Sequence, residues 1–197
     1  MILFEVEEEN MRIELKDAGV PTKEEILEMA KGEKSVILAG NEPLKRVGIA
    51  DIVKKLENEE IMIETSGQEL APIAEKLKKA GLTGVVILVN TMRHTRYKNT
   101  HDGQDLNDVI QGINKAVNQQ MKVRLQVALE PGFSDDEVLD FVQLTFQHDY
   151  EIVFMPTMPY EEIKAKMRLR PVEGDFGDVE MFKYAAARGK IGFLKEA

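Results

Sequence analysis

The sequence predicts an α/β protein, a partial (β/α)6 barrel built on one parallel sheet. Apolar runs of strand length alternate with segments of helical spacing about every thirty residues, the size of a βαβ unit. Such alternation is typical of parallel strands with right-handed crossovers. A complete eight-unit barrel takes about 250 residues, and the chain has 197, so we expect an open barrel. A flat, doubly wound sheet is the alternative.

The first half of the chain is expected to supply three of the six units. Residues 1–10 begin apolar and end acidic, which predicts an edge strand or a loose terminus. Thr22 and Glu25 form a capping-box pattern that begins the first helix, and Gly32 ends it. The following strands and helices are predicted at Arg12–Lys16, Ser35–Ala39, Lys45–Leu56, Glu60–Glu64 and Glu69–Ala80.

The second half continues the alternation from Gly84–Val89, an almost wholly apolar run typical of a strand covered on both faces. The segment Asn90–Gly103 is polar and predicts a connection without regular structure. A second capping-box pattern, Ser134 with Glu137, begins a helix that continues to about His148. The other predicted elements are strands at Lys122–Leu129, Glu151–Met155 and Ile191–Leu194, helices at Gln104–Gln119, Tyr160–Met167 and Val179–Ala187, and a loop at Arg168–Asp178.

No linker divides the chain, so we expect a single domain over residues 1–197, with residues 168–197 as a C-terminal closing segment. A partial barrel leaves an open side whose sheet edges need cover. We expect that cover to come from the closing segment, from a protein partner or from a second copy of the chain.

Composition argues against several classes of function. The formal net charge is -9, which disfavours general binding to nucleic-acid backbones or anionic membrane surfaces. The cysteine count is 0, so the chain offers no thiolate nucleophile and no cysteine ligand for zinc or an iron–sulfur cluster. We find no signal peptide and no apolar run long enough for a membrane span, and we expect a cytoplasmic protein.

Polar residues follow the predicted strands at their carboxyl ends, which share one rim in a parallel sheet. Carboxylates, amides and hydroxyls there suit an amine, a ribose or an amino-acid group, and Gly40 permits close backbone approach. The candidate ligand-binding residues are Gly40, Asn41, Glu42, Pro43, Thr65, Ser66, Asn90, Glu130 and Thr157. The alternative interpretation is that turn-forming residues gather at strand ends for structural reasons alone.

The connection after the fourth strand carries a weaker signal. Arg93, His94 and Arg96 form a candidate anion site, with a solvated basic loop as the alternative. His94 and His101 with Asp102 have the chemistry of metal ligands, but loop histidines are usually solvated, and we assign no metal site. For an enzyme, Glu42 or Glu130 would act as general base, with Arg93 or Arg96 on a substrate anion.

The segment Gly40–Leu44 resembles the Gly-Gly-Glu-Pro-Leu motif of radical S-adenosylmethionine (SAM) enzymes. Further segments match that family in order: Thr65–Gly67 is similar to its Thr-Asn-Gly, and Val86–Gly112 to its fourth strand, Arg-Tyr loop and Gly-x-Asp-Leu helix start. The stretch from Asp135 to Val142, with Phe154 and Met158-Pro159, resembles the molybdenum-cofactor-biosynthesis branch. The resemblance covers residues 11–160 and implies a barrel of the radical SAM type.

The chain departs from this family where the chemistry resides. The family holds a 4Fe–4S cluster with a Cys-x-x-x-Cys-x-x-Cys loop after the first strand, and the corresponding stretch, Lys16–Pro21, has no cysteine. The second motif glycine is Asn41, in a segment that in the family meets the amino group of SAM. These departures from the family imply that the chain holds no iron–sulfur cluster. Because Glu42 of the motif is retained, the resemblance still implies SAM or a nucleoside as a ligand.

Three functional hypotheses follow. The first is a non-redox binding or accessory protein with a small-molecule pocket at the rim. The second is an enzyme with cluster-independent acid–base chemistry at the same rim, and the third is a purely structural interaction protein. The missing cysteines favour a protein without catalytic activity.

Overall fold

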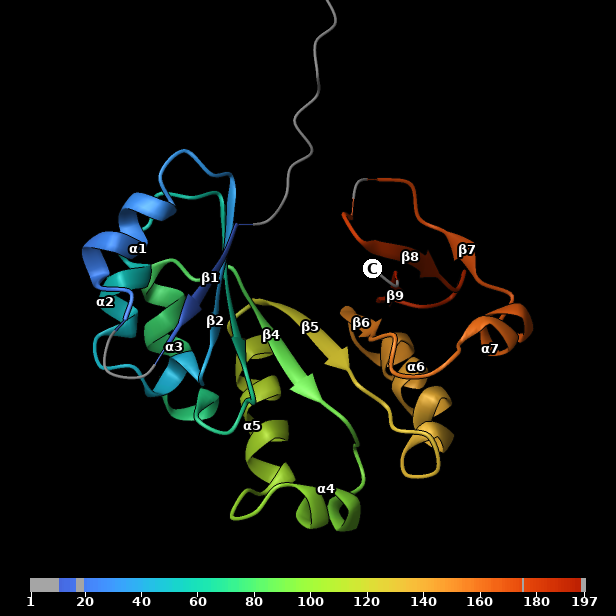
Figure 1. Ribbon diagram of the computed structural model, residues 1–197. Helices are drawn as coiled ribbons and strands as arrows, with labels where there is room; N and C mark the ends of the chain where they lie inside the picture. The colour runs from blue at the N-terminus through green and yellow to red at the C-terminus, as the bar shows by residue number, and fades with distance from the viewer. Residues whose placement is uncertain (1–10, 17–19, 175, 196–197) are drawn as a thin grey trace, which may run out of the picture.

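The computed structural model describes residues 11–16, 20–174 and 176–195, so the expected edge strand or loose terminus at residues 1–10 lies outside them. Within those residues one sheet runs in the order β1-β2-β3-β4-β5-β6-β9-β8-β7 (Figure 1). The strands are β1 (Met11–Leu15), β2 (Ser35–Gly40), β3 (Glu60–Thr65), β4 (Gly84–Val89), β5 (Lys122–Val127), β6 (Tyr150–Phe154), β7 (Arg170–Pro171), β8 (Val179–Lys183) and β9 (Lys190–Leu194).

Strands β1 to β6 are all parallel and lie in chain order, and β9 continues the parallel set beside β6. A doubly wound sheet would reverse its strand order at a switch point. No reversal occurs from β1 to β6, and no ladder joins β1 to β7 among the described residues. The prediction of a partial barrel is confirmed, and the doubly wound alternative is wrong.

The helices fill the connections between parallel strands. The α-helices are α1 (Lys23–Met29), α2 (Ile49–Val53), α3 (Leu70–Ala80), α4 (His94–Thr100), α5 (Leu106–Asn118), α6 (Val138–Gln147) and α7 (Glu161–Lys166), with 3₁₀ turns η2 (Pro43–Lys45) and η3 (Asp135–Glu137). Thr22 and Glu25 cap α1 reciprocally, as the sequence predicts. None of the helices in the described part of the chain is long and apolar enough to span a membrane.

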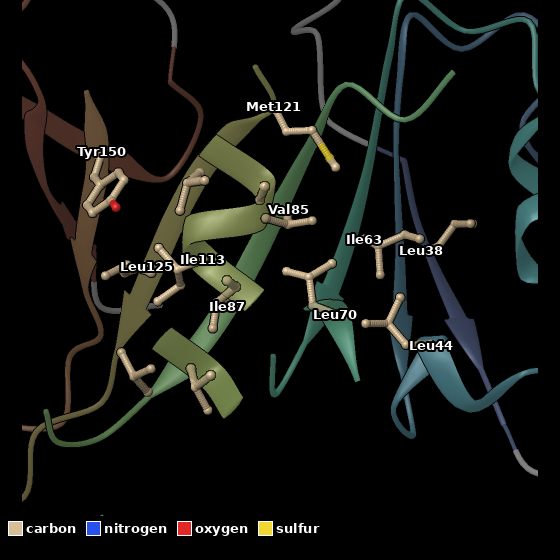
Figure 2. Close-up of a cluster of buried hydrophobic side chains, with 14 of the residues drawn as sticks. Leu38, Leu44, Ile63, Leu70, Val85, Ile87, Ile113, Met121, Leu125 and Tyr150 are labelled. Atoms are coloured by element: carbon tan, nitrogen blue, oxygen red, sulfur yellow. The ribbon is translucent and has the colours of Figure 1, made fainter. Parts of the chain in front are cut away.

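The main core lies between the sheet and the helices. Figure 2 shows Leu38, Ile63, Ile87 and Leu125 of the strands in one buried cluster with Leu70 of α3 and Ile113 of α5. These side chains are buried. Because neighbouring strand residues point to opposite faces, the intervening residues of each strand lie on the face that a closed barrel would enclose.

That second face carries charged pairs. Arg12 of β1 reaches across β2 and donates two hydrogen bonds to the buried carboxylate of Glu64 on β3. Nearer the amino ends of the strands, Glu151 of β6 accepts from Arg124 of β5 at 2.8 Å and from Lys190 of β9 at 3.2 Å. The inner face of this partial barrel is therefore partly polar.

The C-terminal closing segment differs from its prediction in two places. Val179–Ala187 was expected to be helical, but β8 pairs antiparallel with β9 over Val179–Phe182. The sequence Val-Glu-Met-Phe-Lys alternates, which places Met181 in the core beside Gly192, while only the alanines after it favour a helix. Instead of a loop alone, residues 168–178 contain the two-residue strand β7.

Two predictions near the rim are also corrected. The helix expected at Lys45–Leu56 is confined to α2, since Gly48 adopts a φ of 79° and leaves Val47 98% exposed. The connection Asn90–Gly103, expected without regular structure, contains the helix α4. Tyr97 is the single buried residue of α4, and one apolar position does not give the repeated spacing that predicts a helix.

Candidate ligand-binding site

The carboxylate of Glu42 is held at the carboxyl ends of β2 and β3. Glu42 lies just after β2 in the left-handed region, with a φ of 36°. One carboxylate oxygen accepts from the Thr65 hydroxyl at 2.6 Å, and the other accepts from the Ser66 amide at 2.9 Å and from the Ser66 hydroxyl. The predicted convergence of these three residues is present in the structure.

The donors to Glu42 are all neutral. Its other hydrogen-bond partner among the described residues is the Leu44 amide at 3.4 Å, and no described lysine or arginine forms an ion pair with it. Neutral hydrogen bonds orient a carboxylate without cancelling its charge. Glu42 therefore presents a fixed negative charge at the rim.

Gly40 is required by the backbone beside it. A Cβ at this position would lie 2.4 Å from the Leu15 carbonyl oxygen and 2.8 Å from the Leu15 nitrogen, and φ is +102°. The next residue, Asn41, donates its amide to the same carbonyl at 3.0 Å. Gly40 thus lets the ends of β1 and β2 meet, whereas the sequence predicts approach to a ligand.

A cavity of about 340 Å³ opens beside Glu42, within the usual range of small-molecule sites. Of the predicted residues, Gly40, Glu42, Thr65 and Ser66 line it. The lining residues that sequence reasoning missed are Lys45, Glu64, Gln68, Glu69, Leu88, Gly103 and Gln104. Gln68 follows the Thr65–Gly67 motif directly, a usable signal, whereas nothing in the sequence marks Gln104.

The charge of this cavity is predominantly negative. Its lining holds three carboxylates, on Glu42, Glu64 and Glu69, against one ammonium group, on Lys45. Glu64 is neutralised by Arg12, which approaches from β1. Leu88 adds an apolar side chain that is 44% exposed. Such a lining favours a ligand with a positive charge or hydrogen-bond donors and a small apolar portion.

The other predicted rim residues do not line this cavity. Asn90 follows β4, and its side-chain oxygen is buried without a hydrogen-bond partner among the described residues. Glu130 is exposed after β5 and donates its amide to the Ser134 hydroxyl. Thr157 donates its hydroxyl to the Met155 carbonyl. Asn41 and Pro43 flank Glu42 in the chain and lie outside the lining.

The carboxylate of Glu137 joins the β4 and β5 ends of the rim. It is fully buried and accepts from the Thr91 hydroxyl at 2.6 Å and from the Met92 amide at 2.8 Å. The predicted capping box of Ser134 with Glu137 is therefore wrong. Ser134 makes no side-chain cap, and Glu137 reaches the neighbouring loop instead of its own helix end.

The predicted anion-site arginines bind carboxylates of the same chain. Arg96 pairs with Glu137 at 2.7 Å and with Asp136, and Arg93 pairs with Asp136 at 2.8 Å and with Asp140 at 3.3 Å. The hydrogen bond from Arg96, helped by the charge of Arg93, lowers the pKa of Asp136. An external anion would have to compete with these carboxylates, so the anion site stays a prediction.

The histidines of this region make contacts of their own. His94 Nε2 lies 3.0 Å from the side-chain oxygen of Asn107, and His101 stacks on Tyr97 with ring centroids 4.0 Å apart. No group of three or more His, Asp or Glu side chains suited to a metal ion occurs in the described part of the chain.

The sequence matches the model of the radical SAM superfamily over residues 13–145. This chain belongs to the radical SAM superfamily. The match runs from β1 into α6 and includes Glu42, Thr65, Ser66 and Glu137, whereas the rim residue Thr157 lies beyond it.

Curated relatives of this radical SAM protein carry the name GTP 3′,8-cyclase. The protein from Alkaliphilus metalliredigens (strain QYMF) is 30% identical over an alignment of 184 positions, which covers 83% of this chain and 58% of the relative. That from Moorella thermoacetica is 32% identical over an alignment of 213 positions, which covers 89% of this chain and 66% of the relative. That from Listeria monocytogenes is 40% identical over 133 residues, 65% and 40%.

These relatives confirm the predicted molybdenum cofactor biosynthesis protein A-like branch of the radical SAM superfamily. This chain spans about 40 to 66% of the length of these relatives.

The residues of this radical SAM chain do not fit the iron–sulfur cluster that the superfamily implies. Such a cluster needs cysteine thiolates, and the sequence has 0 cysteines. The segment between β1 and α1 is short, with the Lys16 amide donating to the Val20 carbonyl at 2.7 Å. Arg46 donates to the Pro21 carbonyl at 2.6 Å, which ties this segment to η2.

Proposed function

We propose that this chain is a non-redox member of the radical SAM superfamily that binds a small molecule in the cavity beside Glu42. The ligand class is SAM or a nucleoside-like compound, and the protein acts as a binding or accessory component. The carrying observation is a charged carboxylate held by Thr65 and Ser66 at the mouth of a cavity of about 340 Å³.

The balance of charge in the cavity supports the proposed ligand class. A sulfonium or ammonium group would supply the positive charge that Glu42 lacks among its own hydrogen-bond partners. Leu88 gives an apolar contact for a ring or methylene group. Thr65 and Ser66 hold the carboxylate in place beforehand, which lowers the cost of ordering it on binding.

The absence of cysteine supports the non-redox part of the proposal. Reductive cleavage of SAM needs an electron from a cluster, and thiolates are the usual cluster ligands. A chain without cysteine can keep the carboxylate that contacts the ligand and still lack the redox step.

Isothermal titration of the purified chain with SAM, S-adenosylhomocysteine and adenosine tests the binding role. We expect saturable binding of at least one of them and a loss of about tenfold or more in affinity in Glu42→Gln, since a hydrogen bond to a charged group contributes about 1.5–3 kcal/mol. Glu162→Gln, an exposed change on α7, is the matched control and should bind normally.

Anaerobic incubation with iron and sulfide tests the non-redox role. We expect no cluster absorption in the visible range and no cleavage of SAM when a reductant is added. Cluster absorption that survives desalting would overturn this part of the proposal, and a flat titration with all three compounds would overturn the binding part and favour a structural interaction protein.

The second candidate is an enzyme with acid–base chemistry at the same rim. Its support is that Glu42 faces a cavity with further polar groups, on Gln68 and Gln104. Chemical change of a bound compound in the absence of iron, lost in Glu42→Gln, would favour this candidate over a binding protein.

A further inference from the structure

One wall of the Glu42 cavity is made of two side-chain amides joined through a buried tyrosine. Gln68 follows β3, and Gln104 precedes α5; both line the cavity. The Tyr97 ring of α4 lies behind them, 2% exposed and stacked on His101. The direction of the hydrogen bonds in this group can be derived from the backbone.

The backbone of Asp105 determines how the Gln68 amide is oriented. Gln68 Nε2 donates to the Asp105 carbonyl at 2.8 Å, and the Asp105 amide donates to Gln68 Oε1 at 3.3 Å. A backbone carbonyl only accepts and a backbone N–H only donates. If the Gln68 amide were turned over, its oxygen would face the Asp105 carbonyl and its nitrogen would face the Asp105 N–H. Acceptor would then face acceptor and donor would face donor, so this orientation is excluded.

The orientation of Gln68 also determines that of Gln104, because both side-chain amides form hydrogen bonds with the Tyr97 hydroxyl. The second N–H of Gln68 points to the Tyr97 hydroxyl at 3.1 Å, so that oxygen accepts. Its own proton then goes to Gln104 Oε1 at 3.2 Å. A tyrosine hydroxyl keeps its proton at neutral pH, and burial raises the pKa of Tyr97 further. The side-chain oxygen of Gln104 therefore faces Tyr97, and the side-chain nitrogen of Gln104 is available to donate elsewhere.

We infer that Gln104 is a specificity-determining residue whose side-chain N–H groups donate to an unprotonated acceptor of the ligand. Among the described residues Gln104 Nε2 has no hydrogen-bond acceptor, and Gln104 is exposed at the cavity. The ligand class is then a small polar molecule with a cation or hydroxyl for Glu42 and a carboxylate, carbonyl or ring nitrogen for Gln104. This inference rests on the proposed function.

Gln104→Glu tests the inference with almost no change in shape. The new carboxylate still accepts from Tyr97, but it presents an acceptor where the amide presents donors. With SAM as the probe in isothermal titration, we expect binding at least tenfold weaker, because two facing acceptors repel and one hydrogen bond is lost. Gln111→Glu, an exposed position on α5, adds the same charge elsewhere and should bind as the unaltered chain does.

Tyr97→Phe tests the positioning role of the hydroxyl. Without it the Gln104 amide loses its fixed direction, and we expect a severalfold weaker affinity for SAM. In a Gln104→Leu background the same Tyr97→Phe change should have no further effect on affinity, whereas a merely structural role would weaken both backgrounds equally.

Two outcomes separate this inference from the proposed function. If the unaltered chain binds SAM and Gln104→Glu binds it equally well, the inference is wrong and the proposed function stands. If the unaltered chain binds none of SAM, S-adenosylhomocysteine and adenosine, both fall together.

Discussion

At the scale of single residues, Glu137 shows how one buried carboxylate can organise a rim. It joins the loop after β4 to the turn before α6 through Thr91, Met92 and Arg96. A buried charge is stable only when its lone pairs are satisfied, and here a hydroxyl, an amide and a guanidinium satisfy them.

Glu137→Gln should therefore destabilise the fold. The amide nitrogen that replaces one oxygen would face a donor, and we expect a loss of about 2 kcal/mol in the free energy of unfolding. Urea denaturation followed by circular dichroism measures it. Asp140→Asn, an exposed partner of Arg93, is the control and should change stability by less than about 0.5 kcal/mol.

Thr65→Val tests how far the hydroxyl of Thr65 orients Glu42. Valine has nearly the same shape but donates no hydrogen bond to the carboxylate, which then loses its 2.6 Å partner. We expect SAM to bind roughly three- to tenfold more weakly in isothermal titration, the range of one hydrogen bond. An unchanged dissociation constant, with an unchanged melting temperature, would show that the hydroxyl is irrelevant to the site.

At the scale of elements, the contact between β1 and β2 depends on the missing side chain of Gly40. Gly40→Ala would place a methyl group 2.4 Å from a backbone oxygen at a φ of +102°. Left-handed strain and overpacking together predict a loss of roughly 3 kcal/mol in the free energy of unfolding.

Gly32→Ala is the matched control for that strain. Its φ is +85°, but a Cβ there would meet no atom within 4 Å. We expect a smaller loss of about 1 kcal/mol from backbone strain alone. Equal losses at the two positions, measured by chemical denaturation, would contradict the argument that Leu15 is the obstacle at Gly40.

The elements also show which parts of the fold the sequence could predict. The apolar strands β2 to β6 bury one face against helices, a strong local pattern, and they were found. Strand β8 was predicted as helix because the alanines after its alternating residues favour a helix, and its partner strand β9 lies later in the chain. Glu137 looked like a capping residue because Thr91, its actual partner, is distant in the chain.

The candidate site was predictable to a similar extent. Glu42, Thr65 and Ser66 stand at strand ends, and parallel order alone brings such ends together. Gln104 belongs to the same cavity, but its side chain is positioned by hydrogen bonds that run from Gln68 through Tyr97. These bonds depend on where α4 is placed. No local pattern in Asn90–Gly103 indicates that placement.

At the scale of the whole molecule, Glu151 links β5 and β6 to β9, the strand through which β8 and β7 join the sheet. Burial opposes its charged form, but Arg124 and Lys190 outweigh that effect and lower the pKa of Glu151. A lowered pKa in the folded state adds stability above the unfolded value of about pH 4.3. That stability is lost as the pH falls through the folded pKa.

Glu151→Gln should remove this part of the pH dependence. We expect a lower melting temperature than that of the unaltered chain at about pH 7. The two should converge as the pH falls through the folded pKa of Glu151, which lies below the unfolded value. Thermal melts across that range measure it. A constant difference at every pH would mean that packing, and not charge, accounts for the effect of the substitution.

The unbroken succession of β1 to β6 bears on how the protein is made. Each new strand pairs with the one synthesised just before it, so a chain emerging from the ribosome can add one unit at a time to a growing edge. The strands β7 and β8 are synthesised next but join the sheet only through β9, which returns to pair with β6. Assembly can therefore follow translation over most of the sheet, with the seam between β6 and β9 as the last step.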